Sequence, residues 1–463
     1  MCAQRAEVMT TMSESESVNG LERSLGLWQL TASGVGIVIG AGIYVLVGEA
    51  ARAAGAGVWL SFAVAAVLAG LTALTYCELA GMFPSAGVEY EWTSRAFNPF
   101  VGFLAGWMMA VTYILAAAAV SLGFAQYLSH FVSIDERVSA IALLAVLTGI
   151  VAIGIQRSIW LMVALVTLQV GGLVLVIVAG APHIGDRSVV EGATVTGVLS
   201  GASLVFFAFI GFDDIATLSE ETHDAATTVP RALLLTLAIS GALYVVVGLS
   251  AVSVIAPDVL GESTRPLATV VEHDWGPRAS GIITLIALAA TLNTTLLVLT
   301  AASRLLYAMA RAGRLPASLT RVGRRGHAPY VAALVAMAIA VPFAASGGLG
   351  LVASVTDFAV YSTFVAVNLS VIALRFRSPE TVRPFRMPLA IGGVPLTPLL
   401  ALATVVLMAG FLRPTAWMLG GLALALGAVV YWRFGRGHQG GEDAFAVSAR
   451  PQEGPIGTRD TSG

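Results

Sequence analysis

The sequence predicts an all-α membrane protein with about twelve transmembrane helices, and three features lead to this fold class. Charged residues make up 11% of the chain and hydrophobic residues 57%, whereas a soluble domain typically carries about 25% charged residues. Apolar runs of roughly 20 residues, long enough to cross a bilayer, recur along nearly the whole chain. Arginines gather on alternate connections between these runs. The formal net charge of -2 gives no basic footprint for nucleic acid.

The apolar runs divide the 463 residues into one polytopic bundle between two polar tails. We expect a cytoplasmic tail over residues 1–24, a transmembrane domain over 25–434 and a disordered cytoplasmic tail over 435–463. The first tail lacks a basic stretch followed by a short apolar core, so we expect no cleaved signal peptide. The expected spans are 26–48, 57–79, 99–129, 137–155, 159–180, 196–219, 231–256, 279–310, 328–346, 350–374, 393–412 and 415–433.

The distribution of arginine predicts how the bundle is oriented in the membrane. With the N-terminus in the cytoplasm, nineteen arginines fall in inner segments and six in outer segments. Basic residues accumulate on the cytoplasmic side of membrane proteins. An even number of spans brings the C-terminus back to that side. We therefore expect a multi-pass protein of the cell (inner) membrane with both termini in the cytoplasm.

Helix and loop lengths repeat along the chain with a shift of five spans. The third and eighth spans, 99–129 and 279–310, are both unusually long, and each follows a long polar linker. The connections before the fifth and tenth spans are both very short, and the first and sixth spans each have a disrupted centre. An odd shift inverts the second copy in the membrane, as in many secondary transporters. We expect one repeat over about 26–180 and another over about 196–374; chance similarity of lengths is the alternative.

The first span has four glycines within nine residues, from Gly34 to Gly42. Each glycine weakens a helix by up to about 1 kcal/mol relative to alanine. An unwound point at Gly40-Ala41-Gly42 would free backbone N–H groups, at the N-terminus of a half-helix, to bind a carboxylate. Gly36 and Gly40 also form a GxxxG pattern, so close helix packing is the alternative.

The sixth span is interrupted at the corresponding position, where Gly211 precedes Phe212 and two aspartates. Paired breaks in equivalent helices are the best sequence indication of a transport site. We expect free backbone carbonyls at Phe209, Ile210 or Phe212 to accept hydrogen bonds from a substrate ammonium group. Asp213 is a candidate functional charge within a span. An aspartate at the start of a half-helix is also an ordinary N-cap, and we expect the cap.

Four segments carry motifs that are specific in this order: Gly34–Tyr44, Phe83–Tyr90, Phe206–Asp214 with Ser219-Glu220-Glu221, and Ser303–Arg311. In these motifs the chain resembles the amino acid–polyamine–organocation superfamily, over most of residues 22–435. Within it, the chain is similar to the branch containing cationic amino acid transporters and bacterial proton-coupled relatives. The resemblance implies a five-plus-five inverted-repeat core with broken helices 1 and 6, two additional helices at about 393–433, and substrate held between spans 1 and 6.

Carried over residue by residue, the resemblance implies the two sides of a substrate site. The residues that would hold a carboxylate are Ile39, Gly40, Ala41 and Gly42. The residues that would receive the amine and flank the substrate side chain, on either side of Gly211, are Phe209, Ile210 and Phe212.

Two positions depart from the pattern of the proton-coupled relatives. Their fifth span often carries a lysine that replaces a sodium ion, and this chain has Gln169 there. Glutamine does not titrate, so it either holds span 1 through a neutral hydrogen bond or bonds to a neighbouring helix. The acid that can follow the Gly-Trp motif of span 3 is Thr112 here, which makes a cationic substrate less favoured.

The coupling ion, a proton or sodium, stays open, as do exchange and uniport. Thr294 and Thr295 in span 8 offer oxygens suited to sodium, although hydroxyls in membrane helices usually bond back to the preceding turn. Asp357, in the outer part of span 10, either lines an entry path or is hydrated. The six histidines fall in loops, at span ends or in the tail, so we expect no buried metal site and no cofactor.

The sequence therefore predicts a secondary active transporter of neutral or small amino acids, working by alternating access with ion coupling or exchange. Its expected partners are a small-molecule amino acid, a coupling ion and the lipid bilayer, with no nucleic acid. A polyamine or cationic amino acid carrier is the alternative within the class, and a transport-dead amino acid sensor is the alternative outside it. Converging titratable side chains and catalytic motifs are not found in the sequence, which argues against an enzyme.

Overall fold

The computed structural model describes residues 25–83, 88–154, 159–323, 328–391 and 394–435. The expected tail at 1–24, and the tail at 435–463 beyond its first residue, lie outside the described residues. Part of the Phe83–Tyr90 motif and the short connection before the fifth span also lie outside them.

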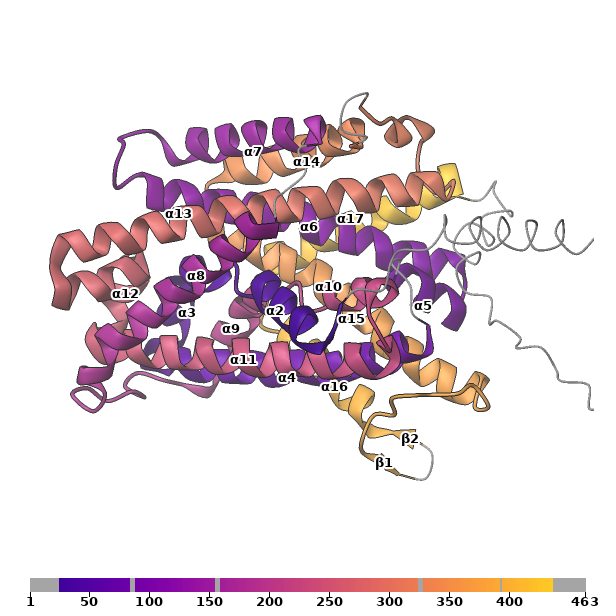
Figure 1. Ribbon diagram of the computed structural model, residues 1–463, viewed down its shortest axis with the longest axis horizontal. Coiled ribbons are helices and arrows are strands. Elements are labelled where there is room, and N and C mark those ends of the chain that lie inside the picture. The colour runs from indigo at the N-terminus through magenta and orange to yellow at the C-terminus, as the bar shows by residue number, and fades with distance from the viewer. Residues whose placement is uncertain (1–24, 84–87, 155–158, 324–327, 392–393, 436–463) are drawn as a thin grey trace, which may run out of the picture.

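The described residues form an elongated helical bundle (Figure 1). Its α-helices are α2 (Leu27–Val38), α3 (Gly42–Ala54), α4 (Val58–Met82), α5 (Val88–Ala96), α6 (Pro99–Leu128), α7 (Glu136–Ile153), α8 (Ile159–Gly180), α9 (Val195–Val205), α10 (Asp214–Thr217), α11 (Ala225–Val254), α12 (Pro257–Glu262), α13 (Pro266–Arg311), α14 (Tyr330–Ser346), α15 (Leu349–Arg377), α16 (Leu396–Ala409) and α17 (Pro414–Val430). The short 3-10 turns are η2 (Gly55–Gly57), η3 (Ala181–His183), η4 (Phe206–Phe209), η5 (Leu218–Glu221) and η6 (Ala317–Thr320), and a π turn, η7, covers Tyr431–Gly435.

The fold class expected from the sequence is confirmed. Within the described ranges, nine helical segments are long and apolar enough to cross a membrane, and α2, α14 and α16 are shorter apolar helices. One of the nine segments combines α3 with α4, and another combines α9 with α10. Joining α2 to α3 as one broken span therefore gives twelve spans in the expected order. A two-residue antiparallel pair, β1 (Ala390–Ile391) with β2 (Val394–Pro395), is the departure from an all-α chain and lies at the margin of the bundle (Figure 1).

In four pairs of spans that lie five apart in the sequence, the two members pack against each other. The contacting pairs are α3 with α9, α4 with α11, α6 with α13 and α7 with α14. Helices α7 and α14 lie side by side in Figure 1. Each pair joins an element of the first half to its counterpart in the second half. This packing is compatible with the predicted inverted repeat, in which a pseudo-two-fold axis relates the two copies.

The linkers expected to be only polar contain helices of their own. The segment before the third span includes α5, and the segment before the eighth span includes α12 and the first part of α13. That first part ends at Gly276, whose φ of 75° is outside the helical region, and Pro277 follows it. Because proline is well suited to the first turn of a helix, the spanning part of α13 begins at this kink.

The centre and the margin of the bundle differ in the environment of their side chains. Helix α6 is almost wholly buried, whereas few residues of α17 are buried. The large exposed side chains of α17 are apolar and include Met418, Leu422 and Val429. Apolar side chains on the outside of a bundle are suited to lipid tails rather than to water. The pattern places α6 in the interior and α17 at the lipid boundary.

A buried ion pair joins the end of α4 to the end of α15. The carboxylate of Glu78 accepts hydrogen bonds from Arg375 Nε at 2.9 Å and from Arg375 Nη2 at 2.5 Å. It also accepts the backbone N–H of Met387 at 3.0 Å and lies 3.4 Å from Arg383 Nε. The side chains of Glu78 and Arg375 are only 1% and 9% exposed. This cluster therefore connects span 2, span 10 and the segment that leads to the last two helices.

Replacing Glu78 with glutamine should destabilise the protein strongly. The variant E78Q leaves two guanidinium groups without their carboxylate, and breaking a buried pair in this way costs about 3–5 kcal/mol. Thermal unfolding of the purified protein in detergent measures the effect. The control is R413Q, because Arg413 is 53% exposed and lies 3.9 Å from Glu49, where a pair contributes about 0–1 kcal/mol. Equal melting temperatures for the two variants would contradict the structural role of Glu78.

Candidate functional site

The first span is broken between α2 and α3. Helix α2 ends at Val38, Ile39 has a non-helical ψ of 71°, and α3 begins at Gly42 without a side-chain cap. The backbone N–H of Ala41 donates to Thr294 Oγ1 at 3.0 Å. In any helix the N–H groups of the first turn have no acceptor within the helix. Those of α3 are therefore directed toward the break, where they favour a negatively charged group.

The sixth span is broken between η4 and α10. Ile210 leaves the helical region with a ψ of 135°, and Gly211 follows with a φ of 106°. That φ favours glycine, and a Cβ atom at Gly211 would also lie 2.8 Å from Ile37 Cγ2. Asp213 Oδ1 accepts the N–H of Gly211 at 3.1 Å, so its side chain holds the turn. The expected N-cap is wrong, because Asp213 makes no capping hydrogen bond to α10.

Tyr244 on α11 connects the two breaks. Its hydroxyl lies 2.7 Å from the carbonyl oxygen of Val38, at the end of α2, and 3.2 Å from that of Ala208 in η4. The side chain is fully buried, and its ring packs against Phe209 at 5.2 Å between centroids. The hydroxyl has one proton, which it donates to either carbonyl or shares between them. Tyr244 is therefore a positioning residue for both half-helices.

The glycines of span 1 allow close packing as well as a break. A Cβ atom at Gly42 would lie 2.6 Å from Ala208 Cα, and one at Gly40 would lie 2.7 Å from Thr294 Oγ1. A Cβ atom at Gly36 would lie 2.7 Å from Val166 Cγ2 on α8. The two predictions for this glycine-rich segment, close helix packing and an unwound point, thus apply at different positions. Gly36 serves packing, whereas Gly40 and Gly42 bring the broken segment against its neighbours.

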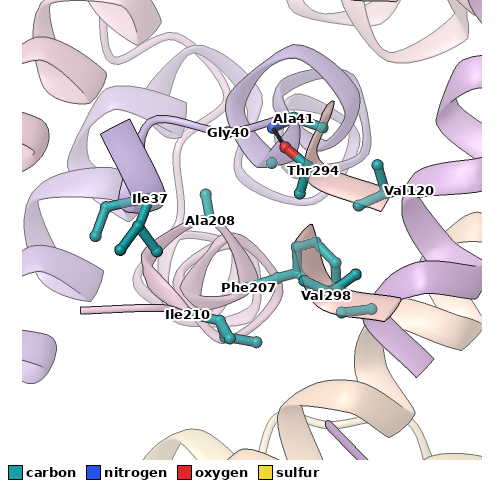
Figure 2. A pocket seen from close by; sticks show the side chains of 12 residues that line it. Ile37, Gly40, Ala41, Val120, Phe207, Ala208, Ile210, Thr294 and Val298 are labelled. Carbon is teal, nitrogen blue, oxygen red and sulfur yellow. Dashed lines mark hydrogen bonds between the residues drawn. The ribbon is translucent and has the colours of Figure 1, made fainter. Parts of the chain in front are cut away.

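A small cavity of about 30 Å³ lies between the two breaks. Figure 2 shows Gly40 and Ala41 on one side, Phe207 and Ala208 of η4 on the other, and Val298 at the flank. The complete lining is Ile37, Val38, Gly40, Ala41, Gly42, Ala116, Val120, Phe207, Ala208, Ile210, Thr294 and Val298. The cavity has room for about two water-sized spheres. Its side chains are apolar except for the Thr294 hydroxyl, and its polar groups are otherwise main-chain groups.

The sequence-predicted binding residues divide into two groups in the structure. Four of them line the cavity: Gly40, Ala41, Gly42 and Ile210. The other four, Ile39, Phe209, Gly211 and Phe212, are absent from its lining. Phe209 turns toward Tyr244, and Phe212 packs between Tyr76 and Phe364, with ring centroids at 5.7 and 5.4 Å.

The five coupling or gating candidates also occupy different environments. Thr294 reaches the break in span 1, whereas Thr112 and Thr295 bond back to the carbonyls of Met108 and Thr291 at 2.9 and 2.8 Å. Gln169 is fully buried, and its side-chain amide has no hydrogen-bond partner in the described part of the chain. Its backbone carbonyl instead accepts the hydroxyl of Tyr44 at 2.6 Å. The expected amide hydrogen bond is therefore absent, and the main-chain carbonyl of Gln169 instead accepts a hydrogen bond from span 1.

Several lining residues were missed by reasoning from the sequence. Ala116 and Val120, both missed, are four residues apart on α6, and Val298, also missed, lies four residues after the predicted Thr294 on α13. Such spacing places each pair on one helix face. The equivalence of spans 3 and 8 under the repeat could have suggested that both helices contribute a face to the site. Nothing in the sequence distinguishes Phe207 from the neighbouring phenylalanines, because the 3-10 geometry of η4 decides which ring reaches the cavity.

Comparison with known proteins supplies the family. The model of the amino acid permease family matches residues 25–431. The branched-chain amino acid permease BcaP of Bacillus subtilis (strain 168) is 30% identical over 94% of this chain and 97% of its own length. The methylthioribose transporter of the same organism is 26% identical over 94% of this chain and 98% of its own length.

A plant protein is also similar to this chain. The vacuolar cationic amino acid transporter 2 of Arabidopsis thaliana is 30% identical over 79% of this chain and 62% of its own length. These relatives are transporters rather than enzymes. The family match covers the twelve spans and both breaks. The chain is a multi-pass membrane protein that transports amino acids, and it belongs to the amino acid permease family.

Proposed function

We propose that this protein is a secondary active transporter of neutral amino acids that works by alternating access. One observation carries the proposal. The cavity between the broken spans is lined by apolar side chains, one hydroxyl and main-chain groups, without an ionisable side chain. Such a site suits a zwitterion whose own side chain is uncharged, because a charged side chain would be buried there without a partner.

In the proposed complex, main-chain groups bind the two charges of the amino acid. The carboxylate faces the first turn of α3 near Gly42, where N–H groups and the helix dipole favour a negative charge. The ammonium group faces carbonyls freed by the break that begins at Ile210. The substrate side chain then extends toward Val120, Phe207 and Val298. Apolar contacts of this kind distinguish substrates by size and polarity.

The size of the cavity supports alternating access. A space of about 30 Å³ is smaller than an amino acid, so binding requires the surrounding segments to move. The breaks in spans 1 and 6 provide points where half-helices can move separately from the rest of the bundle. A carrier opens such a site to one side of the membrane at a time.

The positions of Asp213 and Asp357 support a neutral substrate over a cationic one. A polyamine or a cationic amino acid would be favoured if Asp213 or Asp357 lined the cavity, and neither does. Asp213 holds its own turn, and Asp357 is fully buried in α15. Two of the relatives, from Bacillus subtilis and Lactococcus lactis, are named as branched-chain amino acid permeases. We propose leucine, isoleucine and valine as the first substrates to test.

The proposal extends to energy source, topology and domain division. Ion coupling or exchange provides the driving force, with a proton or sodium as the candidate ion. The arginine distribution supports a cell-membrane location with both termini in the cytoplasm. The packing of spans five apart supports two repeats, at about 26–180 and 196–374, followed by helices at about 393–433.

Counterflow in liposomes tests the substrate assignment. We expect purified protein to exchange labelled leucine, isoleucine or valine, and to exchange arginine and putrescine at least about tenfold more slowly, since about 1.4 kcal/mol of discrimination gives that factor. Uptake with imposed sodium or pH gradients identifies the driving ion. Binding of leucine without counterflow would indicate a sensor, and preferential exchange of arginine would overturn the neutral-substrate proposal.

Filling the cavity should abolish transport without unfolding the protein. In V120F a larger ring occupies the space proposed for the substrate side chain, so we expect leucine uptake to fall at least about tenfold. The control V67F makes the same change on α4, where Val67 is 63% exposed at the surface of the bundle. Both variants should elute as monodisperse protein. Wild-type uptake by V120F would show that substrate binds elsewhere.

Removing the Tyr244 hydroxyl should weaken transport through the position of the half-helices. Y244F leaves the carbonyls of Val38 and Ala208 without this donor, and an unsatisfied buried polar group costs about 1–3 kcal/mol. We expect a lower melting temperature and a reduced leucine affinity. Y330F, at the first residue of α14, removes a hydroxyl from another helix and serves as the control. Unchanged affinity in Y244F would contradict the positioning role.

A further inference from the structure

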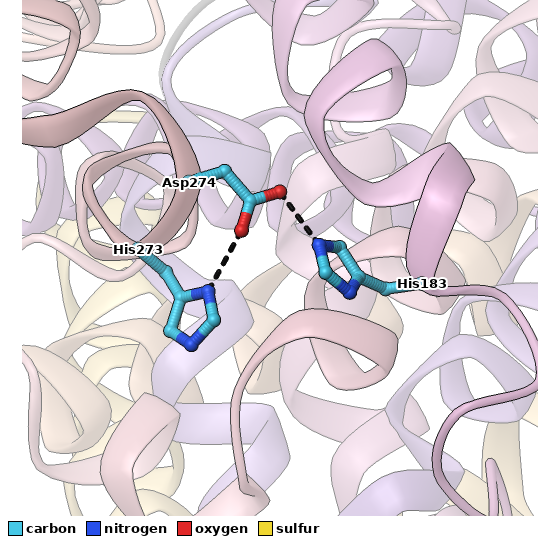
Figure 3. Close-up of side chains that lie close together, drawn as sticks. All are labelled: His183, His273 and Asp274. Carbon is cyan, nitrogen blue, oxygen red and sulfur yellow. Dashed lines mark hydrogen bonds and ion pairs between the residues drawn. The ribbon is translucent and has the colours of Figure 1, made fainter.

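A cluster of two histidines and one aspartate joins α8 to the segment before the kink in α13. His183 ends the η3 turn that follows α8, and His273 and Asp274 lie just before Gly276. Figure 3 shows the Asp274 carboxylate between the two imidazole rings. Asp274 Oδ2 lies 2.7 Å from His183 Nε2, and Asp274 Oδ1 lies 2.8 Å from His273 Nδ1.

We propose that this cluster is a binding site for a divalent transition metal of the zinc class. One ligand atom from each residue, two imidazole nitrogens and one carboxylate oxygen, can be chosen within 4.8 Å of the others. Tetrahedral zinc, with bonds of about 2.0–2.1 Å, places its ligands about 3.4 Å apart, so small side-chain rotations close the site. Three protein ligands leave the fourth position to water, and imidazole with carboxylate is a ligand set that zinc accepts.

A fourth residue supports a metal rather than an incidental hydrogen-bonded group. Asp186 Oδ2 lies 3.1 Å from His183 Nδ1, the ring nitrogen that faces away from Asp274. A metal-binding histidine almost always donates its other N–H to a carboxylate, a carbonyl or water. With Nδ1–H donated to Asp186, the lone pair of His183 Nε2 is directed at the site. The chain thus provides both the ligand and the group that fixes its orientation.

The site is accessible and its charge suits a divalent cation. The side chains of His183, His273 and Asp274 are 28%, 51% and 18% exposed. Asp274 and Asp186 supply two negative charges, while both histidines bind metal in their neutral forms. A bound cation would take the place of the contacts that now join the imidazoles to the carboxylate. Two imidazoles also disfavour magnesium and calcium, which require oxygen ligands.

The metal would connect segments that are 91 residues apart in the sequence. The kink at Gly276 separates the part of α13 that holds His273 and Asp274 from its spanning part. A bridge between this part and the end of α8 would therefore hold the two segments together. It is independent of the amino acid site, which lies at the breaks of spans 1 and 6.

Metal binding to the full-length protein, purified in detergent and freed of any affinity tag, tests the proposal. Equilibrium dialysis against zinc at pH 7.5 should give one tightly bound equivalent that magnesium does not displace. Changes in groups that only orient a ligand typically cost about 10–100-fold in metal affinity. We therefore expect H183Q, which keeps a hydrogen-bond donor but lacks the imidazole, to bind zinc at least about tenfold more weakly. D274N should behave in the same way.

The control for these variants is H130Q, since His130 is another exposed histidine at the end of a span. It should bind zinc as the wild type does. Zinc should also raise the melting temperature of the wild type and of H130Q, but not of H183Q, because a ligand stabilises the state that binds it. Absence of zinc binding by the wild type, or wild-type affinity in H183Q or D274N, would overturn the metal site.

Discussion

Two apolar helices of this protein are broken within a membrane, where lipid offers no hydrogen bonds to the freed main-chain groups. Every main-chain group freed at the breaks must find a partner within the protein or face a polar ligand. The structure meets this constraint with few side chains. Tyr244 contacts a carbonyl from each break. Thr294 accepts a hydrogen bond from a backbone N–H of span 1, and Asp213 accepts a hydrogen bond from a backbone N–H of span 6. In the proposed function, the remaining polar groups at the breaks bind the substrate.

Much of the fold could be predicted from the sequence because lipid imposes a simple pattern. Apolar runs separated by charged connections locate the spans, and the glycines locate both breaks. The helices within the two linkers were missed, since α5 and α12 are short and their sequences do not show the length of a span. Their formation depends on packing against the bundle rather than on hydropathy.

The site could be predicted only in part, for a reason of geometry. Glycines in the sequence indicate where the main chain breaks, so Gly40 and Gly42 were predicted as site residues, and both line the cavity. Which rings and methyl groups face the cavity depends on the 3-10 geometry of η4 and on the turn that follows it. There Phe207 points inward, while Phe209 and Phe212 pack against aromatic neighbours. A shift of one residue in where the helix turns changes which ring faces the cavity. A run of apolar residues does not indicate such a shift.

The contact made by Tyr244 has a mechanical consequence. The Tyr244 hydroxyl on α11 contacts the last turn of α2 and the 3-10 turn of the sixth span. If Tyr244 moved with only one of these segments, its contact with the other would be stretched. A displacement of α11 would therefore act on both half-helices in the same step. The two sides of the proposed substrate site would move together, because a state with one half-helix moved and the other at rest would lose a contact of the Tyr244 hydroxyl. Such coupled movement would favour a carrier that switches between two states over one that populates intermediates with only one half-helix moved.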